Sequence, residues 1–121
     1  METDKKLNVN ITKEGDVAVI GFADASITDP ERINNTASSI HDYIKRNKPR
    51  FVVVDFGNVK FFSSQVLGLI LNIRKHLGQN DGKVVISAID PKLYRVFRIT
   101  NLDKIFEFYT DKDKAIEALE K

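Results

Sequence analysis

Residues 51–68 read FVVVDFGNVKFFSSQVLG, and this stretch carries most of the information about the fold. It opens with an apolar run from Phe51 to Phe56 that contains a single aspartate. Such a run is typical of a central strand covered on both faces, as in a parallel sheet. A short loop follows, and an apolar pattern of helical period starts after Ser63 and Ser64. The stretch therefore predicts a strand, a loop and a helix start in direct succession.

The segment that follows the loop has the pattern of an amphipathic helix. The residues that define it are four apolar positions and a glycine at the expected end: Val66, Ile70, Ile73, Leu77 and Gly78. We take Ser63 as the N-cap residue and Ser64 as the first helical residue. Phe62 and Leu67 then have the spacing of a hydrophobic staple.

The Ser64 hydroxyl has a physical setting that suits regulation. At the first position of a helix it lies near unpaired backbone N–H groups and the positive end of the helix dipole. The fold would tolerate a phosphoryl group there, and the group would add nearly two negative charges to the surface. A serine pair at a helix start is also an ordinary capping device, so the spacing alone leaves a switch and a plain cap both open.

Further strands are predicted on either side of this stretch. Residues 7–12 and 17–22 read as an opening β-hairpin, because a turn composition separates two short strand-like runs. Residues 83–88 and 105–109 read as two later strands.

Three further helices are predicted. Two of them start at Asp-Pro pairs, in which the aspartate suits the N-cap and the proline suits the first helical position: Asp29-Pro30 and Asp90-Pro91. The last helix follows Thr110, which forms an approximate capping box with Asp113.

The predicted order is β-β-α-β-α-β-α-β-α, an α/β fold. Strands that alternate with helices imply right-handed crossovers and a mostly parallel sheet, with helices packed against it. The opening hairpin adds one antiparallel edge. We expect a single domain over residues 1–121, because neither a linker nor a composition shift interrupts the pattern.

Composition and charge exclude several classes of protein. Cysteine is absent, so disulfides, zinc–thiolate sites and cysteine nucleophiles are excluded. The net charge is only +2 and the cations are dispersed among acids, which is not the footprint of a nucleic-acid binder. The start of the chain has no signal-peptide pattern, and its apolar runs are too short to cross a bilayer. We therefore expect a cytoplasmic protein without a membrane segment.

The sequence lacks the common motifs of catalysis. Neither a glycine-rich phosphate loop nor a nucleophile elbow occurs. His41 and His76 lie in helix patterns without metal-ligand spacing, so we expect ordinary helix-surface or boundary residues. We predict no catalytic residue, no metal and no cofactor. An enzyme is the weakest of the functional hypotheses.

The central stretch resembles the STAS domain, the fold of bacterial anti-sigma factor antagonists. The family's segment typically reads Asp-Leu-Ser and then Phe-Met-Asp-Ser-Ser-Gly-Leu-Gly, and this chain has Asp55-Phe56-Gly57 and then FFSSQVLG over residues 61–68. The similarity extends over nearly the whole chain. Further matching positions are Gly21, Asp24, Asp90-Pro91, Val96-Phe97 and residues 100–106.

The resemblance implies signalling by partner switching. Members of the family bind an anti-sigma factor that is also a serine kinase, and a PP2C-type phosphatase reverses the phosphorylation. The family's phosphorylated serine aligns with Ser64, and Ser63 is the second candidate. By the same resemblance, we expect a partner-facing surface formed by Asp24, Phe61, Phe62, Ser63, Ser64 and Gln65. Alternation puts Phe61 and Phe62 on opposite sides, so we expect one to pack under the loop and the other to be exposed as a partner anchor, and the sequence does not say which. We expect a monomer when free, because no apolar stripe remains after each helix face is assigned to the core.

Four positions depart from the family's pattern. Ser63 stands where the family has Asp, Gln65 where it has Ser or Thr, and Val66 where it has Gly. Phe22 also replaces a Glu. A β-branched residue narrows the backbone freedom of the helix start, and two lost carboxylates change the local field. The alternative hypothesis is therefore a STAS interaction module in a signalling complex, without phosphoserine switching.

Overall fold

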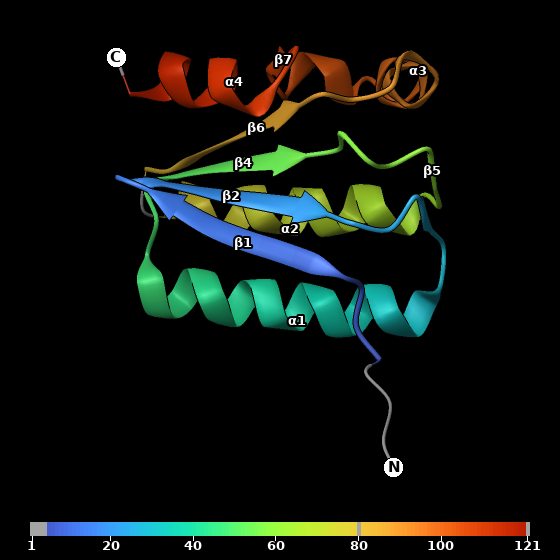
Figure 1. The fold of residues 1–121 in the computed structure, drawn as a ribbon, viewed down its shortest axis with the longest axis horizontal. Coiled ribbons are helices and arrows are strands. Elements are labelled where there is room, and N and C mark those ends of the chain that lie inside the picture. Colours follow the sequence, from blue (N-terminus) through green and yellow to red (C-terminus); the bar gives the residue numbers. More distant parts are fainter. Residues whose placement is uncertain (1–4, 80, 121) are drawn as a thin grey trace.

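A computed structural model describes residues 5–79 and 81–120 and shows a five-stranded sheet with helices on both faces (Figure 1). The strand order is β1-β2-β4-β6-β7, with β1 antiparallel to β2 and the remaining neighbours parallel. This arrangement confirms the predicted α/β fold and its hairpin edge. The strands are β1 (Val9–Glu14), β2 (Val17–Phe22), β4 (Phe51–Asp55), β6 (Lys83–Ser87) and β7 (Phe108–Tyr109).

The central strand β4 is buried on both faces, as its apolar run predicted. Val52 and Val54 belong to the larger core, which the sheet forms with the first three helices. Val53 points to the opposite face and packs into a smaller core with the last helix. Alternation along a strand places successive side chains on opposite faces, so two cores require a strand that is apolar at every position.

In the part of the chain that the structure describes, four α-helices cover the sheet. Their bounds are α1 (Pro30–Asn47), α2 (Gln65–Gly78), α3 (Pro91–Ile99) and α4 (Lys112–Leu119). Both predicted Asp-Pro starts are confirmed. The Asp29 carboxylate accepts hydrogen bonds from the backbone N–H groups of Glu31 and Arg32, at 2.9 and 3.2 Å. Asp90 likewise caps α3 and accepts from the Lys92 N–H group at 2.8 Å.

The last strand and the last cap differ from the prediction. Residues 105–109 were predicted as one strand, but only β7 is extended. The preceding residues form a 3-10 turn, η1 (Leu102–Lys104), and the N–H groups of Ile105 and Phe106 bond to the Leu102 carbonyl. These local bonds remove both residues from the sheet. The cap of α4 is Asp111, which accepts from the Lys114 N–H group at 2.8 Å, and not the predicted Thr110.

The segment before β1 is anchored to α1. The Leu7 N–H group donates to the Thr36 hydroxyl at 2.8 Å, and both residues are buried. Across the described ranges, no helix is long and apolar enough to span a membrane. The large apolar side chains that remain exposed lie on different elements and form no stripe along one helix: Phe61, Leu71, Ile99 and Ile105.

Candidate functional site

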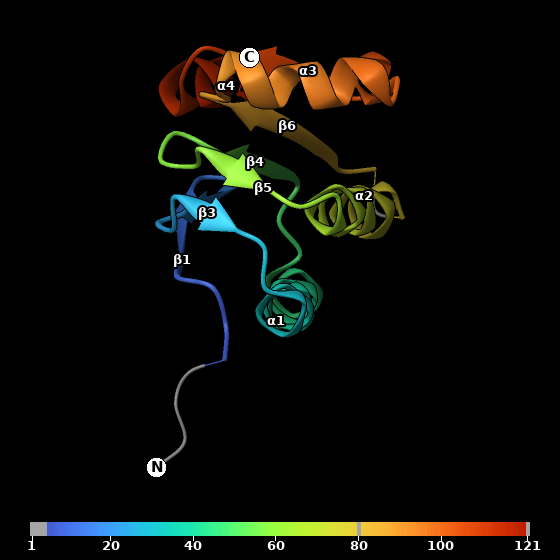
Figure 2. The same ribbon diagram turned by 90° about the vertical axis from the view of Figure 1, so that its right-hand side faces the viewer.

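Two loops at the carboxyl ends of β2 and β4 are joined by a small second sheet. It consists of β3 (Ser26–Ile27) and β5 (Phe61–Phe62), which pair in parallel. Figure 2 shows this pair beside the starts of α1 and α2. The Ala25 carbonyl accepts from the Lys60 and Phe61 N–H groups, at 2.7 and 3.1 Å. The sequence did not predict this pairing, which brings together the predicted partner-facing residues of both loops.

Phe61 and Phe62 point to opposite sides of β5. The Phe61 side chain is 58% exposed, whereas Phe62 is 6% exposed. The Phe62 ring lies in the core, with centroids 5.7 Å from Phe56 and 6.3 Å from Phe97. The predicted opposite orientation is confirmed, and Phe62 is the ring that packs under the loop. Phe62 therefore does not belong to the predicted partner-facing surface, because a buried ring cannot contact a partner while the fold is intact. Phe61 is the aromatic side chain that the surface presents.

Helix α2 starts one residue later than predicted. Its N-cap is Ser64, not Ser63, and Gln65 is the first helical residue. The Ser64 side chain is exposed and makes no capping hydrogen bond. With the cap at Ser64, the residue before it is Ser63, so Phe62 and Leu67 no longer have the spacing of a staple. The Ser64 hydroxyl is thus open to solvent and has no structural task in this helix start.

Ser63 has the opposite environment. Its Oγ atom is buried and has no hydrogen-bond partner, while its N–H group donates to the Ile27 carbonyl at 3.0 Å. The Ser63 hydroxyl is therefore shielded, whereas the Ser64 hydroxyl is open to solvent. The first turn of α2 has no acidic side chain. A negative charge on Ser64 would meet the positive end of the helix without a like charge in that turn.

Gln65 joins the starts of the two helices. Its side-chain Nε2 donates to the Pro30 carbonyl at 3.2 Å and to the Asn34 side-chain oxygen at 3.0 Å. The amide is therefore engaged inside the fold, although the resemblance assigned this position to the partner-facing surface. The same bonds fix the position of the turn that carries Ser64 relative to α1.

Asp24 lies in the loop after β2 and ties this loop to the segment that precedes β1. Its two carboxylate oxygens accept from the backbone N–H group of Asn8 at 2.9 Å and from the Asn8 side-chain amide at 3.1 Å. The cap of α1 is Asp29, as the Asp-Pro pair predicted. Asp24 lies next to Ala25, which bonds to Lys60 and Phe61, so it stands at the edge of the same surface.

Asp55 was not assigned a role by the sequence. It ends β4, and its Oδ1 accepts a hydrogen bond of 2.8 Å from the hydroxyl of Ser87, which is fully buried at the end of β6. The bond holds together the carboxyl ends of the neighbouring strands β4 and β6, at the point where the chain leaves β4 for the loop that leads to β5. The sequence feature that could have indicated this role is that Asp55 is the single carboxylate in the apolar run of residues 51–56.

These side chains gather around the two loops at the carboxyl ends of β2 and β4. In the part of the chain that the structure describes, no group of three or more His, Cys, Asp or Glu side chains is placed to hold a metal ion. The surface offers an exposed aromatic ring and a free hydroxyl on a firmly bonded loop pair. Exposed aromatic residues on rigid elements commonly act as anchors in protein interfaces.

The sequence pattern that defines the STAS domain family matches residues 10–115 of this chain. The chain therefore belongs to this family. Among curated relatives, an anti-sigma F factor antagonist from Paenibacillus polymyxa is 29% identical over 77 residues, which cover 64% of this chain and 66% of that protein. A putative anti-sigma factor antagonist from Thermotoga maritima is 34% identical over 71 residues, 59% of this chain and 60% of that protein. The matched parts thus span less than two thirds of these relatives.

Solved structures share the fold. A STAS domain protein from Planctomyces limnophilus superposes with a TM-score of 0.84 at 24% identity, covering 93% of this chain and 98% of that one. The unphosphorylated form of the anti-sigma factor antagonist SpoIIAA gives 0.82 at 17% identity, covering 93% and 96%. At these identities the likeness establishes the fold alone.

Proposed function

We propose that this protein is an anti-sigma factor antagonist that binds an anti-sigma factor with serine kinase activity and is switched by phosphorylation of Ser64. In this proposal the protein acts in the bacterial cytoplasm as a non-enzymatic regulator. A PP2C-type phosphatase restores the binding form. Relatives named as anti-sigma factor antagonists support the general role.

The observation that carries the proposal is the state of the Ser64 hydroxyl. It is exposed, free of any capping bond and located at the start of α2, next to the loop that presents Phe61. A phosphoryl group there would place nearly two negative charges beside the apolar anchor. Such a charge weakens docking through desolvation and repulsion, while the hydrogen bonds of the loop pair stay intact. SpoIIAA, which shares this fold, is known in unphosphorylated and phosphorylated forms.

The second candidate function is a STAS interaction module without phosphoserine switching. Two observations favour it. Ser63 and Gln65 stand where the resemblance predicts Asp and Ser or Thr, and Gln65 is bonded to α1 instead of facing outward. A kinase that reads those positions would meet a different surface here.

The deciding experiment combines mapping of the modification with partner capture. The protein is isolated from its own cells, grown with and without stress and with phosphatases blocked, and its phosphorylation sites are mapped by mass spectrometry. We expect phosphate on Ser64 with an occupancy that changes with stress. In parallel, Ser64→Asp should lose the anti-sigma partner that co-purifies with the unmodified protein.

The matched control is Ser38→Asp, because Ser38 is an exposed serine on α1, away from the two loops. This variant should keep the partner, and circular dichroism should show both variants folded. An unmodified Ser64 in every condition, together with normal binding by folded Ser64→Asp, would exclude the switch and leave the interaction module.

A further inference from the structure

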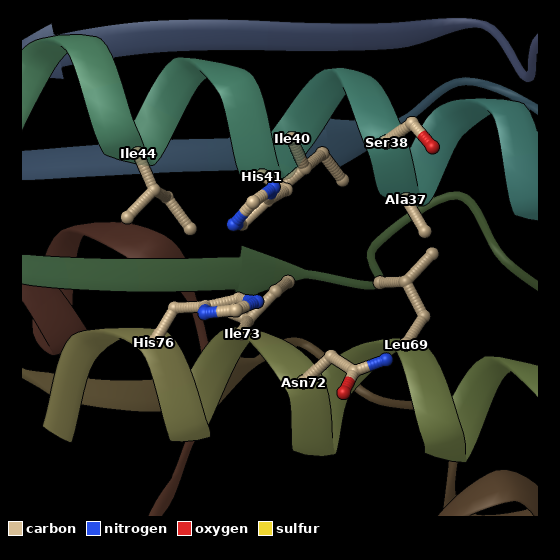
Figure 3. Close-up of a pocket in the computed structure, with 9 residues that line it drawn as sticks. All are labelled: Ala37, Ser38, Ile40, His41, Ile44, Leu69, Asn72, Ile73 and His76. Carbon is tan, nitrogen blue, oxygen red and sulfur yellow. The ribbon is translucent and has the colours of Figure 1, made fainter. Parts of the chain in front are cut away.

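Two hollows lie between α1 and α2, far along both helices from Ser64. The first has a volume of about 230 Å³ and the second about 190 Å³, and the same three side chains line both: His41, Ile44 and His76. Figure 3 shows the two histidines facing each other from the two helices. Their ring centroids are 4.1 Å apart and their planes are inclined by 39°. The sequence predicted both as ordinary helix-surface or boundary residues.

The second hollow has a cationic rim. Its remaining lining residues are Lys45, Lys48 and Gln79, from the ends of the two helices. Lys75 lies beside His76 on α2. Among residues 5–79 and 81–120, the ion pairs join Lys5 to Glu31 and Lys83 to Glu107, so none of the three lysines near the histidines is neutralised in this way.

The charged side chains that line this groove are basic, and among the described residues no carboxylate lines it. The pKa of His76 is lowered by burial first, and then by the neighbouring His41 and Lys75. The acidic residues nearest in sequence are Asp42, next to His41, and Asp81, after α2, and neither lines the hollows. Two helix carboxyl ends contribute roughly half a negative charge each, which is less than the full charges of three lysines.

This charge distribution decides which ligand the groove favours. Two imidazoles suggest a transition metal at first sight, but three ammonium groups nearby would repel a divalent cation. The rings also face each other, whereas ligands to one metal need in-plane nitrogens that converge. An anion gains from every one of these groups, because lysine, imidazolium and the Gln79 amide are all hydrogen-bond donors.

We propose that the groove formed by His41, Lys45, Lys48, His76 and Gln79 binds the phosphate group of a small soluble ligand. The ligand bridges the carboxyl-terminal parts of α1 and α2, whose opposite ends Gln65 holds together. The bound anion favours the protonated form of the His76 imidazole. This site is independent of the proposed switch at Ser64.

Titration of the histidine side-chain NMR signals tests this site. Inorganic phosphate replaces chloride at constant ionic strength, and glycerol 3-phosphate serves as the soluble ester. We expect saturable shifts at His41 and His76, and a higher titration midpoint for His76 in phosphate than in chloride. The double variant Lys45→Ala/Lys48→Ala should bind about three- to tenfold more weakly, since two exposed cations that face the anion are removed.

The matched control is Lys92→Ala/Lys104→Ala, which removes the same charge from α3 and η1 and should bind phosphate normally. Shifts that never saturate, or an equal loss of binding in both double variants, would overturn the site. Vesicles of phosphatidylglycerol separate a lipid headgroup from a soluble ester. Sedimentation with the vesicles without any response to the two soluble phosphates would also overturn the proposal.

Discussion

The Gln65 side chain on α2 donates a hydrogen bond of 3.0 Å to the side-chain oxygen of Asn34 on α1, and a second one of 3.2 Å to the Pro30 carbonyl. A polar residue at the start of one helix thereby fixes its distance to the start of the next. Ser64 immediately precedes this residue, so the position of its hydroxyl depends on the same two bonds.

Gln65→Ala should lower the free energy of unfolding by about 1–2 kcal/mol, because two hydrogen bonds are lost at a partly exposed site. Urea denaturation measures the change. Gln79→Ala is the matched control, since Gln79 lies at the exposed other end of α2 and should change stability by less than about 0.5 kcal/mol. Equal losses in the two variants would show that the Gln65 bonds contribute nothing specific.

The two neighbouring phenylalanines should separate stability from binding. Phe62→Ala should cost about 3–5 kcal/mol of unfolding free energy, because it leaves a cavity between Phe56 and Phe97. Phe61→Ala should cost less than about 1 kcal/mol, because the side chain is exposed. It should nevertheless abolish co-purification of the protein partner. A folded Phe61→Ala protein that retains its partner would remove Phe61 from the interface.

The two serines should respond differently to alanine. Ser63→Ala should keep or raise the unfolding free energy by up to about 1 kcal/mol, because it deletes a buried hydroxyl without a partner. Ser64→Ala should change it by less than about 0.5 kcal/mol, since no capping bond is lost. Asp29→Ala, which removes a true cap, should cost about 1 kcal/mol in the same thermal or urea assay. A Ser64→Ala loss as large as that of Asp29→Ala would contradict a free Ser64 hydroxyl.

Stability should depend on pH through Glu107. The hydrogen bond from Lys83, at 2.6 Å, and a second bond from the Tyr109 hydroxyl lower the pKa of the Glu107 carboxyl below its ordinary value. The folded state therefore favours the charged form. The charged Glu107 carboxylate stabilises the folded state fully at pH values above the pKa of about 4.5 that this group has in the unfolded chain. This stabilisation is lost as the pH falls through the lower pKa of the folded state.

The measurement is the stability difference between the wild type and Glu107→Gln from about pH 6 to pH 3. The difference should shrink over this acidic range and stay constant near neutral pH. Because the Lys83 and Glu107 side chains are both about half exposed, the change in unfolding free energy with pH should be small and should weaken with added salt. A pH-independent difference would contradict this account.

The sequence predicted those features of the fold that depend on residues close together along the chain. The Asp-Pro pairs gave the starts of α1 and α3, since an aspartate cap and a proline act on the next turn alone. The continuous apolar run gave β4, because a strand with two buried faces leaves a distinct pattern.

Features that depend on distant residues were missed or misplaced. The pairing of β3 with β5 involves strands of two residues, too short to show any alternation. The contact of His41 with His76 depends on how two helices are rotated against each other. The resemblance predicted a partner-facing Gln65, because the matching position of the family lies on that surface. The structure shows that the Gln65 amide is instead hydrogen-bonded to α1.

The backbone bonds between the loops at Ala25 and Lys60 have a consequence for recognition. Loops usually lose conformational entropy when a partner immobilises them, and that loss weakens binding. Here the hydrogen bonds of the fold have already restricted the chain around Phe61 and Ser64. A partner that docks there, as we propose, would meet a rigid surface, and association would require little rearrangement of this protein. A charge added to Ser64 would not be relieved by movement of its own loop.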